Sequence, residues 1–232
     1  KKNYIVSNHS ISFEKKIDLK NISFSYRSKN KNIKIISRSD FSLKIGDFVW
    51  ISGPSGGGKT TLLEILLNLL KVESASYLVD GKKIVKNSNI SSLFAYVPQK
   101  VYIKTGSIQN NITLDTQPKS KTERERFNQI LKILKIKNFL KKGSRTINFN
   151  PGDRGEKLSG GQKQRIGIAR AIYQSKEILF MDEATSALDK KTEGEILKNL
   201  TKNKTNAITV IMITHRPRDE VKYDKIIEVK NN

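Results

Sequence analysis

The stretch GPSGGGKT at residues 53–60 constrains the fold of this chain more than any other feature. It follows the apolar run at residues 48–51 and leads into a helical pattern at residues 62–67. Glycines reach backbone angles that are closed to residues with a β-carbon, so successive amide N–H groups can converge on an anion. The N-terminal dipole of the following helix favours the same negative charge. A strand, a glycine loop and a helix in this order predict a phosphate-binding loop.

The polar residues of this loop have expected roles toward a nucleoside triphosphate. Lys59 supplies a mobile charge for the β- and γ-phosphates, and the Thr60 hydroxyl is placed to bind a Mg²⁺ ion that bridges them. The residues predicted to contact the nucleotide here are Gly53, Ser55, Gly56, Gly57, Gly58, Lys59, Thr60 and Thr61. The motif indicates a nucleoside triphosphate, but it does not indicate how the energy is used.

Composition sets wider limits on the function. The chain has 232 residues, enough for one large domain or two small lobes, and it has no Cys, which excludes disulfides and thiolate metal sites. No apolar run approaches the ~20 residues that span a bilayer. The net charge of +22, from 44 basic and 22 acidic residues, would attract polyanions. A solvated lysine-rich surface is the favoured explanation of this charge.

Two acidic residues end a second apolar run. Residues 178–181 are apolar and lead into Asp182 and Glu183. In a chain with a phosphate-binding loop, Asp182 is expected to hold Mg²⁺ through water, and Glu183 is expected to polarise the attacking water as a general base. Gln99 and His215 follow the predicted strands at 94–97 and 208–213, at the strand ends where ligands gather in α/β sheets.

A second anion-receptive helix start is predicted at residues 158–162, whose sequence is LSGGQ. Ser159 can cap the helix that follows, while Gly160 and Gly161 leave its first amides uncovered. The chain therefore has two predicted phosphate-receiving surfaces, the glycine loop at residues 53–60 and the helix start at residues 158–162.

The remaining segments define the predicted organisation. Residues 17–24 and 33–45 alternate apolar and polar residues, which predicts a small antiparallel β lobe. Residues 119–145 carry ten basic and two acidic residues and are expected to form a helical insertion with a basic outer face. A solvated helix surface is favoured there over a dedicated polyanion site. Its residues at helical spacing are Phe127, Ile130, Leu131, Leu134 and Asn138.

With these motifs in order, the chain resembles the ATP-binding cassette (ABC) ATPases from about residue 17 to 230. Two further segments resemble exporter-type transporters: residues 152–155, similar to the loop that contacts the coupling helices of the membrane domain, and residues 106–112 after Gln99. The resemblance implies an α/β fold, a P-loop NTPase core with a mostly parallel sheet, an N-terminal antiparallel β lobe and an inserted α-helical subdomain. The implied boundaries are a lead-in from a missing membrane domain at 1–16 and an ATPase domain at 17–232, in which 17–100 and 160–232 form the core and about 101–159 the helical subdomain.

The resemblance also implies site roles. Tyr26 matches the aromatic residue that stacks on adenine, and Ser159, Gly160, Gly161 and Gln162 would bind the ATP held by a second copy. The implied catalytic residues are Glu183, His215, Gln99 and Lys59, and the implied Mg²⁺ ligands are Thr60, Gln99 and Asp182.

The expected function is therefore that of the ATP-hydrolysing motor domain of an exporter or flippase, with ATP and Mg²⁺ as ligands. Its expected partners are a second copy in an ATP-dependent head-to-tail dimer and a transmembrane domain fused N-terminally, at the cytoplasmic face of a membrane such as the bacterial inner membrane. The alternative is a soluble ABC ATPase acting on nucleic acid. No nucleic-acid partner is expected, because no long coiled coil, zinc module or second cassette is present. The transported molecule is not encoded in this segment.

Overall fold

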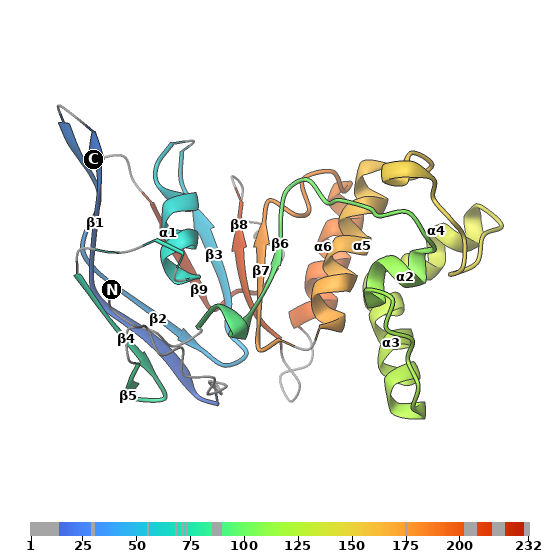
Figure 1. Cartoon of the computed structure of the whole chain (residues 1–232), viewed down its shortest axis with the longest axis horizontal. Helices are drawn as coiled ribbons and strands as arrows, with labels where there is room; N and C mark the ends of the chain where they lie inside the picture. The colour runs from blue at the N-terminus through green and yellow to red at the C-terminus, as the bar shows by residue number, and fades with distance from the viewer. Residues whose placement is uncertain are drawn as a thin grey trace, which may run out of the picture. The chain divides into compact units, whose positions relative to one another are not determined.

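The computed structural model describes residues 14–28, 31–54, 56–67, 69–70, 72, 74–84, 90–174, 176–201, 208–214 and 221–229. The chain folds into two compact units. The first comprises Lys1–Phe94, Ile208–Pro217 and Tyr223–Asn232, and the second comprises Ala95–Ala207 and Arg218–Lys222. Figure 1 labels the helices and strands of both.

The first unit combines an antiparallel sheet with parallel strands. The antiparallel sheet has the order β2-β1-β4-β5, and β3 lies between β8 and β9 with parallel pairing on both sides. Its elements are β1 (Lys16–Ser28), β2 (Lys31–Lys44), β3 (Phe48–Ser52), α1 (Lys59–Leu66), β4 (Ser74–Val79), β5 (Lys82–Lys83), the short 3₁₀ helix η1 (Ile90–Leu93), β8 (Thr209–Ile213) and β9 (Lys225–Glu228). The first four residues of β3, from Phe48 to Ile51, are buried, as expected for a strand flanked on both edges.

A bulge explains the uneven alternation of β1. Ile17 and Leu19 are buried, and the buried positions then continue at Ile22 and Phe24, one residue out of phase. The pairing of β1 with β2 shifts between Leu19 and Ile22, and Asn21 has a φ of 54°. Asn tolerates this left-handed conformation better than most residues, so the extra residue keeps both apolar pairs on the core face.

The second unit is mainly helical. Helices α2, α3 and α4 pack on α5, and β6 is hydrogen-bonded to β7. Its elements are β6 (Phe94–Val97), α2 (Ile108–Thr113), α3 (Lys121–Ile133), α4 (Ile136–Lys142), η2 (Asp153–Gly155), α5 (Gly160–Tyr173), β7 (Ile178–Asp182) and α6 (Lys190–Thr201). The parallel strands, the antiparallel sheet and the helices confirm the predicted α/β fold class with an antiparallel β lobe and a helical subdomain.

The ends of two predicted helical segments are set by the backbone. α1 ends at Leu66, within the helical pattern expected at residues 62–67, because the amides of Leu69 and Leu70 turn back onto the carbonyl of Glu64. The basic helical segment is two helices, interrupted where Lys135 takes a φ of 53°. The break shifts the helical phase, so Asn138, expected in line with the apolar positions, is exposed.

The carboxylate of Asp80 fixes the start of β1. Its oxygens accept backbone N–H bonds from Glu14, Lys15 and Lys16 at 2.9, 2.7 and 2.8 Å. Burial alone would raise the pKa of Asp80, but these three hydrogen bonds stabilise the charged form and the net result is a lowered pKa. A carboxyl group with a lowered folded pKa contributes stability above its unfolded pKa and loses it as the pH falls.

We therefore expect Asp80→Asn to lower the free energy of unfolding by about 1–2 kcal/mol at pH 7, since an amide oxygen replaces a charged acceptor. The difference between variant and wild type should shrink below about pH 4, where the wild-type carboxyl group becomes protonated. Urea unfolding can be followed through Trp50, the single tryptophan, which is buried in the first unit. Glu125→Gln, at an exposed position of α3, is the control. An equal loss at pH 3 and pH 7 would contradict this prediction.

Candidate functional site

The predicted phosphate loop joins β3 to α1 in the first unit. Gly53, Gly56 and Gly58 have φ angles of 148°, 79° and 95°, which confirms that this loop uses backbone conformations that favour glycine. A β-carbon on Gly53 would lie only 2.2 Å from the carbonyl oxygen of Val229, so a side chain there is excluded by the backbone of the neighbouring strand end. Gly57 is buried, and Thr60 is exposed in the first turn of α1.

Lys59 is folded onto this loop. Its side chain is 8% exposed, and its Nζ atom donates hydrogen bonds to the carbonyl oxygens of Gly53 and Pro54 at 2.9 and 2.8 Å. The charged ammonium group therefore lies against the segment that the sequence predicts to bind phosphate. Triphosphate oxygens would be stronger partners for it than neutral carbonyl groups.

Tyr26 is presented beside the same helix. Its ring packs edge-to-face on Phe24 with centroids 5.0 Å apart, and its hydroxyl lies 3.2 Å from the hydroxyl oxygen of Thr61 on α1. The ring nevertheless remains 44% exposed. An anchored, accessible aromatic face suits stacking on a planar base.

The carboxylates and the glutamine meet in the second unit. Gln99 follows the end of β6 and Glu183 follows the end of β7, and the Nε2 atom of Gln99 donates to Oε2 of Glu183 at 2.7 Å. The hydroxyl of Tyr96 donates to Oδ2 of Asp182 at 3.1 Å. Glu183 has a φ of 49°, a conformation that costs on the order of 1–3 kcal/mol and is found where the surroundings fix it.

The donor atoms of this group fit Mg²⁺. Asp182 offers carboxylate oxygens, and Gln99 keeps its amide oxygen available because its Nε2 atom is directed at Glu183. Among the described residues there is no cluster of three or more His, Cys, Asp or Glu side chains that could hold a metal ion. Mg²⁺ is usually held by one or two carboxylates together with water and substrate phosphates.

The LSGGQ segment begins α5 with a reciprocal cap. The Ser159 hydroxyl accepts from the amide of Gln162 at 3.3 Å, and the Gln162 side-chain oxygen accepts from the amide of Ser159 at 3.1 Å. The predicted Ser159 cap is thus confirmed. The glycines have a packing role as well, because a β-carbon on Gly161 would lie 2.8 Å from the carbonyl oxygen of Ala187.

Sequence reasoning missed Gln164. Its side chain is 4% exposed and forms hydrogen bonds within the second unit that reach the Gln99 and Glu183 backbones. A polar residue between buried Gly161 and Ile168 on the core face of a helix is the signal that could have identified it.

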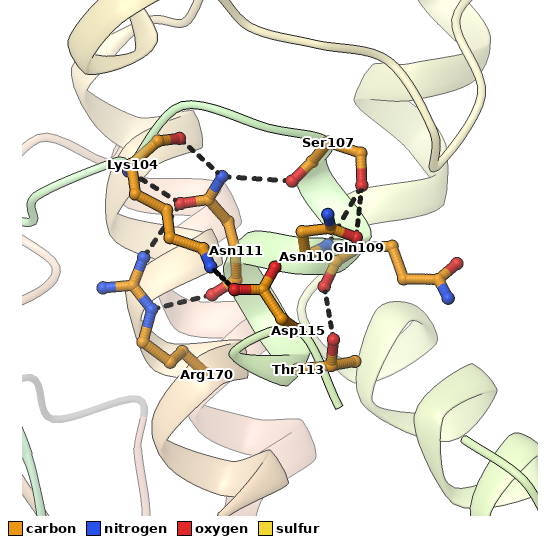
Figure 2. A network of polar contacts seen from close by, with 8 residues as sticks. All are labelled: Lys104, Ser107, Gln109, Asn110, Asn111, Thr113, Asp115 and Arg170. Atoms are coloured by element: carbon orange, nitrogen blue, oxygen red, sulfur yellow. Dashed lines mark hydrogen bonds and ion pairs between the residues drawn. The ribbon is translucent and has the colours of Figure 1, made fainter. Parts of the chain in front are cut away.

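The segment after Gln99 is held rigidly on α5. The side chain of Asn111 is fully buried, donates to the carbonyl oxygens of Lys104 and Ser107 at 2.9 and 3.0 Å, and accepts from the amide of Lys104 at 2.9 Å. Arg170 on α5 donates to the carbonyl oxygen of Asn111 at 2.8 Å (Figure 2). Lys104 is also paired with Asp115. Every polar atom of the Asn111 amide is therefore engaged, which fixes this turn.

The predicted site residues fall into two groups. The first unit holds Tyr26, the phosphate loop and Thr61, and the second holds Gln99, Asp182, Glu183 and the LSGGQ segment. Ser55 and His215 lie outside the described residues. The contacts of Gln99 with Glu183 and of Ser159 with Gln162 are direct.

A strand, a glycine loop and a helix with a buried lysine, together with a second strand that ends in paired carboxylates, define a P-loop nucleoside triphosphatase. The chain belongs to the ABC transporter family, whose model matches residues 36–186. The similar proteins include an export ATP-binding/permease protein and an Atm1-family ABC exporter, in agreement with the exporter-type ATPase domain that the resemblance implied.

Three similar proteins illustrate this family. An export ATP-binding/permease protein of Rickettsia felis is 39% identical over 202 residues, which cover 86% of this chain and 34% of that protein. The multidrug resistance-like ATP-binding protein MdlA of Buchnera aphidicola is 37% identical over 212 residues, covering 90% and 36%. A bacterial Atm1-family ABC exporter solved with ATP bound matches with a TM-score of 0.77 and 29% identity, covering 95% of this chain and 38% of that one.

The chain thus spans about a third of the length of these relatives. The nucleic-acid alternative gains no support from them. Among the described residues, no helix is long and apolar enough to cross a membrane.

Proposed function

We propose that the chain is the motor domain of an ABC exporter or flippase, in which ATP binding joins two copies head to tail and ATP hydrolysis separates them. The contact of Gln99 with Glu183 at the end of β7 carries this proposal, because it pairs the expected general base with a residue of the expected metal set. Lys59 and the phosphate loop would bind the triphosphate, and Tyr26 would stack on adenine.

In the proposed reaction, the Glu183 carboxylate accepts a proton from water as that water attacks the γ-phosphate. The amide of Gln99 orients the Glu183 side chain by donating to its Oε2 atom. Mg²⁺, when bound by Thr60, Gln99 and Asp182, would offset the charge that develops on the phosphate oxygens. His215 is proposed to contact the γ-phosphate.

The amides at the start of α5 support the proposed second copy. The Ser159 hydroxyl and the Gln162 side-chain oxygen accept hydrogen bonds from each other's backbone amides. The amides of Gly160 and Gly161 therefore remain to bind an anion at this helix N-terminus. Within the described chain, no other residue at the start of α5 accepts a hydrogen bond from these two amides. In the proposed dimer, the phosphate that they bind belongs to the ATP of the other copy.

The proposed membrane partner is a transmembrane domain, fused N-terminally, at the cytoplasmic face of a membrane such as the bacterial inner membrane. The turn fixed by Asn111 supports this docking role, because Tyr102 and Leu114 flank it and are 64% and 49% exposed. Gly155, from the loop that resembles the exporter contact, lies so close to Ile103 that a β-carbon would approach it to 3.0 Å. The exposed apolar side chains of Tyr102 and Leu114 are therefore attached to a closely packed part of the chain.

This proposal predicts that ATP turnover depends on the concentration of the protein. Phosphate release with Mg²⁺-ATP should give a specific activity that rises from nanomolar to micromolar protein and then levels off, since mass action controls assembly of a shared site. A hydrolysis rate per molecule that stays constant over this range would contradict the shared site, and absence of hydrolysis at all concentrations would contradict the motor function.

A further inference from the structure

We infer that Gln164 is a positioning residue for ATP hydrolysis, which links the helix that starts at the LSGGQ segment to the turn that carries Glu183. This inference rests on the proposed function. Gln164 lies on α5, one turn after Gly161, and its side chain is 4% exposed. A buried amide must find partners for both its donors and its acceptor, so its contacts are specific.

The Gln164 side chain contacts three segments of the second unit. Its Nε2 atom donates to the Gln99 carbonyl oxygen at 3.3 Å and to the Ser186 hydroxyl at 3.1 Å, and it lies 3.5 Å from the Glu183 carbonyl oxygen. Its Oε1 atom accepts from the amide of Ala187 at 2.9 Å. One side chain therefore holds the backbones of the two residues whose side chains meet at 2.7 Å, Gln99 and Glu183.

The turn at Glu183 needs such support. Its left-handed φ of 49° is unfavourable for a residue with a side chain, and strained positions persist when the surrounding contacts fix them. The carbonyl oxygen of Glu183 also accepts from the amide of Ser186 at 3.0 Å. Without Gln164, the turn would lose its hydrogen bonds to α5 and the bridge through them to the Gln99 backbone, and the carboxylate could move out of line with its water.

The glycines of α5 make the same link through packing. A β-carbon on Gly161 would lie 2.8 Å from the carbonyl oxygen of Ala187, and one on Gly167 would lie 2.5 Å from Val101. The start of α5 thus touches the turn after Glu183, and its middle touches the segment after Gln99. Gln164 lies between these two contacts and adds directional hydrogen bonds to them. Through these contacts, a phosphate bound at the start of α5 would affect the position of Glu183 in the same copy.

Two variants of this chain test the inference. Gln164→Leu removes all of the hydrogen bonds, whereas Gln164→Glu keeps the size of the side chain and an acceptor for the Ala187 amide but removes the donors. We expect both to lower kcat for Mg²⁺-ATP by about 10–100-fold, because misplaced catalytic groups cost this much. The dissociation constant for ATP, measured by calorimetry, should change less than about twofold, because Lys59 and its loop are unaltered.

The controls separate this inference from the proposed function. Gln174→Leu and Gln174→Glu change the same residue type at the exposed end of α5 and should keep wild-type kcat. If the wild type hydrolyses ATP and Gln164→Glu keeps its kcat within about twofold, the inference fails while the proposed function stands. If the wild type does not hydrolyse ATP, the proposed function fails first. Unfolding of both Gln164 variants at 25 °C would assign Gln164 to core stability alone and overturn the inference.

Discussion

Lys59→Ala is expected to weaken ATP binding by at least about 100-fold, which corresponds to roughly 2.8 kcal/mol. The Nζ atom of Lys59 is the charged donor at the centre of the phosphate loop, and its hydrogen bonds to Gly53 and Pro54 hold it there. Backbone amides alone would keep part of the anion site, but charge-assisted hydrogen bonds are about twice as strong as neutral ones. Calorimetric titration with Mg²⁺-ATP measures the change directly.

A companion variant and a control make this result specific. Lys59→Met keeps the apolar stem in its buried position and should weaken binding as much as Lys59→Ala does. Lys83→Ala removes the same charge from an exposed position of the first unit and should leave the affinity for ATP unchanged. ATP affinity within about threefold of wild type in both Lys59 variants would show that the loop does not bind triphosphate through this lysine.

Much of the site could be predicted because its residues follow directly from local sequence patterns. The glycine loop occupies the junction between β3 and α1, where strand and helix patterns meet. Gln99 and Glu183 lie in contact because both follow strand ends, and the strand ends could be read from apolar runs. Ser159 caps α5 because a hydroxyl at that position satisfies an amide of the first turn.

Other features depend on contacts between residues far apart in the sequence. Helical spacing in the basic segment predicts a buried face, but it does not reveal that Lys135 enters the left-handed region and divides the segment. The extent of α1 is similarly set by carbonyl and amide groups that fold back after Leu66. Ser55, His215 and the domain boundaries remain predictions from the sequence.

Gln164 shows the same limit within the site. Its position on α5 predicts burial, but its partners come from segments 65, 19 and 22 residues away in the sequence. No periodic pattern encodes such contacts. They are determined by the packing of α5 against the strand ends, which only the three-dimensional structure supplies.

Glu183→Gln is expected to lower the rate of ATP hydrolysis by about 10²–10⁴-fold while leaving ATP binding intact. An amide at this position can still accept the hydrogen bond from Gln99, so the local geometry should persist, but it cannot take the proton of the attacking water. In the proposed cycle the γ-phosphate joins the two copies and hydrolysis separates them. The variant should therefore accumulate as an ATP-bound dimer.

Gel filtration with Mg²⁺-ATP, run beside phosphate-release assays, tests both parts of this prediction. Glu177→Gln, at an exposed position just before β7, is the matched control and should behave as the wild type does. Loss of hydrolysis together with a persistently monomeric profile would retain Glu183 as the base but reject the joining of copies through ATP. Accumulation of the dimer with ATP and its dissociation with ADP would instead tie assembly to the γ-phosphate, because that phosphate is the difference between the two nucleotides.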